Sequence, residues 1–301
     1  MSKVKKGIYL IKRKALLAYG KKLPDTVEAD AKYLKKLYKL RMKKPLNLDN
    51  PQTYNEKLQW LKLYDRKPEY TEMVDKYAVK DYVGEKLGEE YLIPTLGVWE
   101  SFDDIDFDKL PNQFVLKCTH DSGGLVICTD KSKLDMKKTK QKIEKCFKRN
   151  YFYNTREWPY KNVKPRIIAE EYMVDESGYE LKDYKIFTFN GEAKLMFIAT
   201  DRGAETETCF DFFDKDFNHL PFRNGHPNST KEIKKPENYE EMFRLAEILG
   251  KDIPQARIDF YNINGKIYFG EITLFHWSGT QPFDPPEWDK TLGDWIKLPQ
   301  K

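Results

Sequence analysis

Apolar residues in the first third of the chain recur at spacings of three and four, the period of an amphipathic helix. Tyr33, Leu37 and Leu40 follow this spacing, and Lys44-Pro45 ends the segment. The capping box Thr53-x-x-Glu56 begins another helix. Besides the one that starts at Thr53, the predicted helices span about residues 27–42, 71–87, 135–149 and 238–249.

Beyond about residue 110 the pattern changes to short apolar runs rich in β-branched and aromatic residues, which favour strands. Asn190-Gly191 and Asn264-Gly265 each separate two such runs and predict the tight turns of β-hairpins. Because few helices lie between the runs, we expect antiparallel sheets in an α+β fold. The predicted strands are Phe114–Thr119, Leu125–Cys128, Ile167–Met173, Tyr184–Phe189, Lys194–Thr200, Cys209–Phe213 and the two halves of Arg257–Thr273.

Three segments that contain proline are predicted to be irregular. Trp158-Pro159-Tyr160 and Asn162–Pro165 have the composition of loops, and Pro285-Pro286 is predicted to begin a C-terminal tail. The length of 301 residues favours about two domains.

Charge is distributed unevenly along the chain. Residues 1–45 contain fifteen Lys or Arg and three Asp or Glu, a balance of +12, so a net charge of +5 leaves −7 for the remainder. A basic N-terminal region of this kind binds nucleic acid, an anionic membrane surface or an acidic polymer. The aromatic interleaving of single-strand binders is absent, so no nucleic-acid partner is expected. A solvated, lysine-rich helix is the alternative to peripheral membrane contact.

No apolar run approaches the roughly 20 residues that a transmembrane helix needs. The short apolar patch Ile8–Ile11 leads into Lys12-Arg13-Lys14 and not into a cleavage site, so no secretory signal is expected. The four cysteines lack the paired spacing of a zinc site and are too few for a disulfide framework. We expect a soluble protein of the reducing cytoplasm, with the inner face of the membrane as a possible docking place.

The predicted hairpin Arg257–Thr273 contains the strongest candidate chemistry. Asp259 and Glu271 lie at nearly matched distances from the Asn264-Gly265 turn, so the hairpin brings the two carboxylates side by side. Crowded carboxylates favour a shared divalent cation. Arg257 points to the same face by strand alternation. Alternatively, the three residues form a solvated, salt-bridged face.

Two other strands carry charged residues near turns. Lys117 lies in an apolar strand that runs into Ser122-Gly123-Gly124, as in a flap whose backbone N–H groups close over phosphates. An ordinary glycine hairpin with an exposed lysine is the alternative. Glu170-Glu171 at the end of another strand could accept a hydrogen bond from an adenine amine, or simply reach water. Lys185 could reach a terminal phosphate, or lie on the surface.

Together these segments resemble the ATP-grasp superfamily in order and approximate spacing. The resemblance rests on the segments above and on Asp75-Lys76, Ile93-Pro94 and Gly270-Glu271-x-Thr273. The amino-acid sequence is similar to that of the TupA-like branch in three segments, Asn55–Asp65, Leu110–His120 and Lys235–Asn238. This branch is associated with teichuronopeptide, capsule and other surface-polysaccharide biosynthesis. The resemblance covers about residues 30–296.

The resemblance implies an ATP-grasp fold, in which two antiparallel-sheet lobes sandwich ATP and a basic helical region precedes them. It divides the chain into residues 1–72, the flap-bearing lobe 73–174 and the metal-bearing lobe 175–301. ATP and Mg²⁺ are the implied cofactors. For the phosphates, the resemblance implies Lys117 with Lys76 or Lys80 at the α- and β-phosphates, Lys185 and Arg257 at the γ-phosphate, and a flap formed by Ser122, Gly123 and Gly124. For the nucleoside, it implies Glu170 or Glu171 with Tyr172 and Met173 at adenine, and Asp175 or Glu180 at ribose. For magnesium, it implies Asp259, Glu271 and Thr273.

Thr273 stands where many relatives have asparagine, although a hydroxyl can also bind magnesium directly or through water. His120 and His276 are candidate general bases, with a hydrogen-bonded loop histidine as the alternative for each. The acceptor-site candidates are Arg202, Arg223, Trp277 and Ser278, because guanidinium groups pair with carboxylates and a sugar face stacks on indole.

The implied activity is an ATP- and Mg²⁺-dependent carboxylate–amine ligase acting through an acyl phosphate. Its expected partners are an acidic sugar or polysaccharide precursor and an amino acid or amine. One alternative is a glycosyltransferase, for which Asp104-Ile-Asp106 and Asp214-Lys-Asp216 are candidate metal motifs. Another is a non-catalytic scaffold that binds ATP or polysaccharide.

Overall fold

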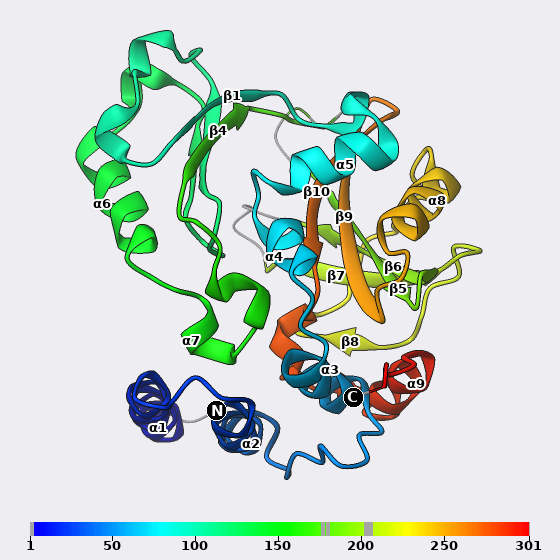
Figure 1. Cartoon of the computed structure of the whole chain (residues 1–301). Coiled ribbons are helices and arrows are strands. Elements are labelled where there is room, and N and C mark those ends of the chain that lie inside the picture. Colours follow the sequence, from blue (N-terminus) through cyan, green and yellow to red (C-terminus); the bar gives the residue numbers. More distant parts are fainter. Residues whose placement is uncertain (1–2, 176–177, 179–180, 202–206, 301) are drawn as a thin grey trace.

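The computed structural model describes residues 3–175, 178, 181–201 and 207–300. Two β-sheets lie side by side, with helices around them and beneath them in Figure 1. The α-helices are α1 (Lys3–Lys21), α2 (Val27–Met42), α3 (Tyr54–Tyr64), α4 (Glu69–Val74), α5 (Val79–Leu87), α6 (Met136–Phe147), α7 (Phe152–Thr155), α8 (Tyr239–Leu249) and α9 (Glu287–Trp295).

Antiparallel pairing joins all the strands, as expected for an α+β fold. A four-stranded sheet has the order β1-β4-β2-β3, a five-stranded sheet has the order β10-β9-β5-β6-β7, and β11 pairs with β8. The strands are β1 (Thr95–Trp99), β2 (Phe114–Cys118), β3 (Leu125–Cys128), β4 (Ile167–Glu171), β5 (Asp183–Phe189), β6 (Glu192–Thr200), β7 (Cys209–Asp214), β8 (Arg223–Asn224), β9 (Gln255–Ile263), β10 (Lys266–Thr273) and β11 (Phe283–Asp284).

Each large sheet has its own hydrophobic core. The four-stranded sheet packs against α6 through residues such as Leu116, Ile143 and Ala169. The five-stranded sheet packs against α8, and its core extends without a break into α2, α3, α4 and α5. The N-terminal helices are therefore part of the five-stranded lobe's core, whereas the four-stranded lobe is a separate unit.

Most predicted elements are present, with ends that coincide or differ by at most two residues. The capping box at Thr53 is confirmed, because its hydroxyl accepts from the Glu56 amide and the Glu56 side chain accepts from the Thr53 amide. The predicted tight turns join β5 to β6 and β9 to β10, with both asparagines and both glycines at positive φ. Asn264-Gly265 therefore sets the register of the hairpin that carries the acidic pair.

The single helix predicted over 71–87 is wrong, because the chain breaks into α4 and α5. The Asp75 carboxylate accepts hydrogen bonds from the backbone amides of Tyr77 and Ala78, at 2.9 and 3.4 Å, and this turn interrupts the helix. The Lys76 amide then donates to the Thr119 carbonyl at 3.2 Å. The break places Lys76 beside the end of β2.

Three further segments differ from the prediction. The segment after Pro285-Pro286 is the helix α9, whose Asp289 accepts from the Asn55 amide of α3 at 3.0 Å, so it is no loose tail. Trp158–Lys161 forms a 3₁₀ turn. The half-buried strand β1 was not predicted, because its residues Thr95–Trp99 do not alternate between buried and exposed positions. Among the described residues, no helix has the length and apolar character to cross a membrane.

Candidate active site

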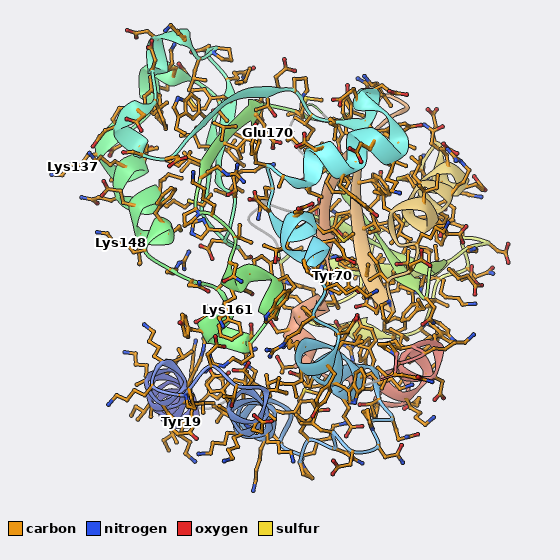
Figure 2. All side chains as sticks on the ribbon, viewed as in Figure 1. Tyr19, Tyr70, Lys137, Lys148, Lys161 and Glu170 are labelled. Atoms are coloured by element: carbon orange, nitrogen blue, oxygen red, sulfur yellow. The ribbon has the colours of Figure 1, made fainter. Side chains whose placement is uncertain are left out.

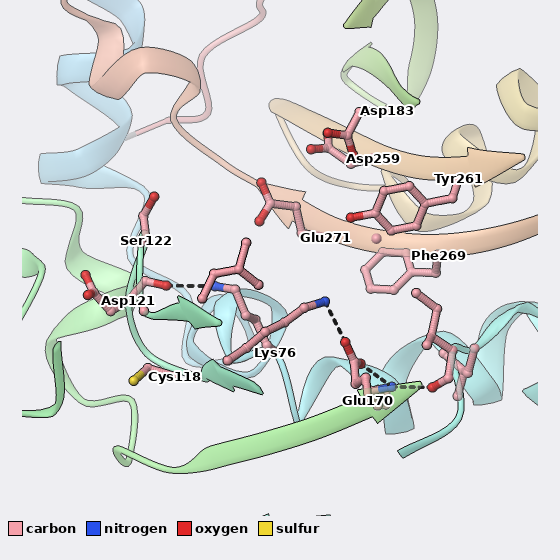
Figure 3. A pocket seen from close by; sticks show the side chains of 18 of the residues that line it. Lys76, Cys118, Asp121, Ser122, Glu170, Asp183, Asp259, Tyr261, Phe269 and Glu271 are labelled. Carbon is pink, nitrogen blue, oxygen red and sulfur yellow. Dashed lines mark hydrogen bonds and ion pairs between the residues drawn. The ribbon is translucent and has the colours of Figure 1, made fainter. Parts of the chain in front are cut away.

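A pocket of about 340 Å³ lies between the two large sheets, and side chains from both lobes face into it (Figure 3). The four-stranded lobe supplies β2, β4 and the turn after β2, and the five-stranded lobe supplies β5, β9 and β10. The predicted site residues that line this pocket are Lys76, Lys80, Lys117, Ser122, Gly123, Gly124, Glu170, Lys185, Asp259 and Glu271.

One wall of the pocket is cationic. Lys117 from β2 and Lys80 from α5 pair with the two oxygens of Glu170, at 2.5 and 2.6 Å. Burial raises the pKa of Glu170, but the two lysines outweigh burial and hold this pKa below its usual range. Because both oxygens are occupied, Glu170 positions the two lysines in this structure; it does not stand open toward an adenine.

The other predicted adenine and ribose contacts lie away from the described lining. Glu171 is exposed at the end of β4, and Tyr172 and Met173 follow the strand, half-buried. The buried Asp175 carboxylate pairs with Lys182 at 2.9 Å. Glu180 and Arg202 lie outside the described residues.

The opposite wall is acidic. Asp259 of β9 and Glu271 of β10 are direct cross-strand partners, next to a bulge at Gly270. Arg257 donates to both oxygens of Asp259 at 2.7 Å and to Glu271 at 2.9 Å. Lys185 of β5 also pairs with Asp259. The structure thus brings together the predicted acids and their cations on one face of the sheet.

Glu271 carries its negative charge at neutral pH. Burial raises the pKa of Glu271, but Arg257, Lys185 and Lys76 outweigh it and hold this pKa at about 2. The Glu271 side chain is 39% exposed, so it stays open toward the pocket. Burial lowers the pKa of Lys185, and the charge of Asp259 opposes this effect.

Asp259 and Glu271 could hold a divalent cation. Mg²⁺ in phosphate-transfer sites takes one or two carboxylates and completes its shell with phosphate oxygens and water. Two carboxylates on neighbouring strands match the share of such a shell that a protein supplies, and within the described ranges no group of three or more His, Cys, Asp or Glu forms a metal cage. Thr273 does not line the pocket, because its hydroxyl accepts from Arg257 and donates to Glu271 at 3.1 Å.

The turn after β2 forms the edge of the pocket. Gly123 has φ +112°, a left-handed conformation that favours glycine. A Cβ at Gly124 would collide with Cys118 and Cys146. Lys76 donates to the Asp121 carbonyl at 2.9 Å, which ties the α4–α5 break to this turn (Figure 3). Two glycines and a lysine therefore close over the space between the sheets.

Both candidate bases are buried and engaged elsewhere. The His120 ring contacts the Cys146 carbonyl at 3.3 Å, and burial lowers its pKa. His276 Nδ1 lies 2.9 Å from Arg257 Nη1, and its Nε2 lies 3.0 Å from Asn224 Oδ1. Arginine can only donate, so Nδ1 accepts and Nε2 carries the proton. Burial and the charges of Arg257 and Lys185 hold the pKa of His276 well below its usual value.

Polar residues of α3 hold the loop that carries His276. Gln59 donates to the carbonyls of Ser278 and Gly279 at 2.9 and 2.7 Å, and Lys62 donates to Ser278 at 2.8 Å. Trp277, Ser278 and Gly279 all have positive φ, which costs a non-glycine residue about 1–2 kcal/mol. The helix thus fixes a strained loop and, through it, the partner of Arg257.

The predicted acceptor residues are separated. Ser278 is buried and donates to Glu157, and Arg223 pairs with Asp284 on the surface. Trp277 is 42% exposed and lines a second hollow, of about 340 Å³, with Tyr9, Arg41 and Lys43 among its other walls. The cations beside Trp277 therefore come from the N-terminal helices and their edge.

Comparison with protein families assigns this fold. A family model described as TupA-like ATP-grasp matches residues 56–297. The chain belongs to the TupA-like ATP-grasp family. Comparison with curated proteins gave no match.

This TupA-like ATP-grasp chain is also similar to solved structures of ligases at low identity. A D-alanine–D-alanine ligase from Bacillus anthracis complexed with ATP is 16% identical, with a TM-score of 0.40, over 74% of this chain and 57% of that one. The D-alanine–D-alanine ligase from Helicobacter pylori is also 16% identical, with a TM-score of 0.42, over 82% of this chain and 69% of that one. The ATP-grasp ligase PsnB complexed with minimal precursor, Mg and ADP is 10% identical, with a TM-score of 0.38, over 73% of this chain and 57% of that one.

In this TupA-like ATP-grasp chain, sequence reasoning missed several pocket residues. Asp183 lies two residues before Lys185, Tyr261 two after Asp259 and Phe269 two before Glu271, and all three line the pocket. Strand alternation from the predicted residues could have found them. The Asp-x-Asp motifs lie elsewhere: Asp104 ends one 3₁₀ turn and Asp106 caps the next, whereas Asp214 ends β7 and Asp216 lies in the turn that follows.

Proposed function

We propose that the chain is an ATP- and Mg²⁺-dependent ligase that activates a carboxylate as an acyl phosphate and joins it to an amine. The observation that supports this proposal is the pocket between the sheets, where Lys117 of the four-stranded lobe, with Lys76 and Lys80 from the α4–α5 segment, faces the Asp259–Glu271 pair. Phosphoryl transfer depends mainly on positioning and charge neutralisation, and a wall of each sign provides both.

Each wall has a separate task in this proposal. Lys76, Lys80 and Lys117 bind phosphate oxygens, and Glu170 holds the latter two lysines in place. Asp259 and Glu271 hold Mg²⁺, which when bound neutralises the phosphate oxygens. Lys185, beside Asp259, is positioned for the transferred phosphoryl group. Arg257 acts mainly by holding the acidic pair in register, because its five contacts tie it to Asp259, Glu271 and the neighbouring Thr273 and His276.

The chemistry proceeds in two balanced steps. A carboxylate oxygen takes the γ-phosphoryl group and ADP leaves, which converts a poor electrophile into an acyl phosphate. The amine nitrogen then attacks the acyl carbon, the carbon–oxygen bond to phosphate breaks, and the departing phosphate takes up the proton that the amine loses. His120 and His276 are hydrogen-bonded away from the pocket, so the proposal assigns neither as a base.

The proposed substrates are a uronic-acid sugar of a surface polysaccharide or its precursor, and an amino acid or amine. The hollow beside Trp277 supports this choice, because it combines an exposed indole with the cations Arg41 and Lys43. Indole rings stack on sugar faces, and a guanidinium pairs with carboxylate. Arg41 already donates to Thr280 at 2.8 Å, which fixes its position at the edge of this hollow.

The test is ADP release, measured while uronic-acid sugars are crossed with amino acids and product masses are recorded. Asp259→Asn and Glu271→Gln should each abolish ADP release and leave the fold intact, because each removes one carboxylate from the metal pair. Glu247→Gln is the matched control and should turn over like the wild type, because this half-buried residue of α8 pairs with Lys215 and does not line the pocket. Undiminished turnover in both site variants would refute the metal assignment.

A further inference from the structure

The outer face of α1 carries apolar side chains that remain accessible to solvent. Ile8, Ile11, Ala15 and Ala18 recur at spacings of three, four and three, so they share one face of the helix. All four are exposed, Ile8 by 49% and Ile11 by 70%. We call these four residues the outer stripe. Over the described residues, Ile11 is the most exposed large hydrophobic side chain.

The side of α1 that carries Leu16 and Gly20 attaches the helix to the protein, and Tyr19 lies between this side and the outer stripe. Leu16 and Tyr19 pack against the main core, and Lys36 of α2 lies 4.0 Å from the centre of the Tyr19 ring. The Gly20 carbonyl accepts from the buried Arg156 at 2.5 Å. α1 lies at the edge of the molecule beside α2 and α7, away from the two sheets (Figure 1). The outer stripe therefore faces away from the protein.

Positive charge surrounds the outer stripe. On a helical projection Lys12 lies on one flank, and Lys14 and Lys21 lie on the other. The neighbouring α2 adds several further lysines, and Figure 2 shows nitrogen-tipped side chains projecting around both helices. An apolar stripe between lysines is typical of helices that lie in the plane of a membrane interface. Lysines near such a surface each add attraction to anionic headgroups.

We propose that α1 docks this protein on an anionic phospholipid bilayer, with Ile8 and Ile11 among the acyl chains and the flanking lysines on the headgroups. The stripe needs an apolar partner, and the lysines need an anionic one. A bilayer with anionic lipids provides both. A second copy of the chain is disfavoured, because pairing through the stripe would bring two regions of balance +12 together. Nucleic acid offers no apolar layer for isoleucine.

Vesicle sedimentation of the full-length protein tests this proposal without ATP or substrate. The wild type should bind vesicles of phosphatidylcholine with phosphatidylglycerol far better than vesicles of phosphatidylcholine alone, and high salt should weaken this binding. Ile11→Glu should reduce binding about tenfold or more, because it removes an isoleucine side chain that the bilayer would take out of water. Lys12→Ser/Lys14→Ser should also reduce it about tenfold or more.

Matched controls lie on α6. Met136 is 42% exposed, so Met136→Glu repeats the change of charge, and Lys137→Ser/Lys142→Ser repeats the loss of two lysines. Both controls should bind like the wild type, and circular dichroism should show the same fold in all variants. Equal loss in the controls, or no binding of the wild type to anionic vesicles, would overturn the proposal. The proposal would also be overturned if the wild type formed a dimer in solution that does not bind vesicles and that Ile11→Glu converts to a monomer.

Discussion

Arg257 and Lys62 are both buried basic residues, but their surroundings shift the two pKa values in opposite directions. Burial alone would lower the pKa of Arg257, yet Asp259 and Glu271 raise it above its usual value. Lys62 contacts carbonyl oxygens and the amide oxygen of Gln59, so burial lowers its pKa to about 7 and Glu157 only partly opposes this. Arg257 is therefore a permanent charge, whereas Lys62 titrates near neutrality.

The titration of Lys62 predicts a pH-dependent stability. Between about pH 7 and 10.5 the unfolded chain holds a proton on Lys62 that the folded chain has released. Stability rises with pH wherever the unfolded state binds more protons. The unfolding free energy of the wild type, relative to Lys62→Met, should therefore increase across this window and be constant below it. Urea denaturation of both proteins at a series of pH values measures this difference.

Any cost of losing the hydrogen bonds of Lys62 is the same at each pH, so only the slope tests the prediction. Lys57→Met on the same helix is the graded comparison, because Lys57 is only half-buried and burial lowers its pKa less than that of Lys62. Its difference from the wild type should therefore change less with pH. A difference between wild type and Lys62→Met that does not change with pH would contradict the assignment.

At the scale of elements, the loop Trp277–Gly279 depends on α3. The backbone there is left-handed at three consecutive residues, and a Cβ at Gly279 would collide with Gln59 and Leu58 of α3. Helix and loop therefore meet at a position that admits only hydrogen. The same loop carries His276, so its docking also affects the pocket.

Gly279→Ala should destabilise the protein by about 1–3 kcal/mol or more, because the new methyl overpacks the contact and strains the left-handed backbone. Gly7→Ala is the control, because a Cβ at Gly7 in α1 meets nothing within 4 Å and alanine favours a helix. Thermal unfolding of the two variants and the wild type provides the measurement. If Gly279→Ala has the same melting temperature as the wild type, the contact with α3 does not hold the loop in place.

Local pattern predicted the hairpins and most strands, because an Asn-Gly turn and alternating apolar residues act over a few neighbours. The face shared by Arg257, Asp259 and Glu271 follows from the same rule. The break at Asp75 could not be predicted from the spacing of apolar residues, because Tyr77 and Ala78 fit the helical spacing. The helix is interrupted because the Asp75 carboxylate accepts hydrogen bonds from the backbone amides of both residues. Side-chain chemistry there overrides the apolar repeat.

Long-range partners explain what remained hidden. Gln59 and Lys62 look like the polar side of α3, but both are buried because carbonyls more than 200 positions away accept their hydrogen bonds. Glu170 suggested an adenine contact, yet Lys80 and Lys117 reach it from two other elements. Sequence spacing carries no information about such partners, so the residue types were found and their pairings were not.

At the scale of the whole molecule, the pocket joins two units with separate cores. The four-stranded sheet packs on α6, and the five-stranded sheet shares its core with the N-terminal helices. Figure 1 shows the two sheets side by side, and residues of both line the pocket. A ligand that contacts both walls would therefore link two units that each have their own local stability.

Binding of an ATP analogue with Mg²⁺ should consequently slow amide hydrogen exchange in both lobes at once. Protection is expected at the turn Ser122–Leu125 on one side and around Phe269–Glu271 on the other, since both segments line the pocket. Helix α1 supplies the internal control, because it lies outside this pocket and its exchange should not change. Mass spectrometry of peptic peptides resolves the three regions. Protection of only one sheet would mean that the ligand occupies a single wall, and protection of α1 to the same degree would indicate general tightening rather than a nucleotide held between the lobes.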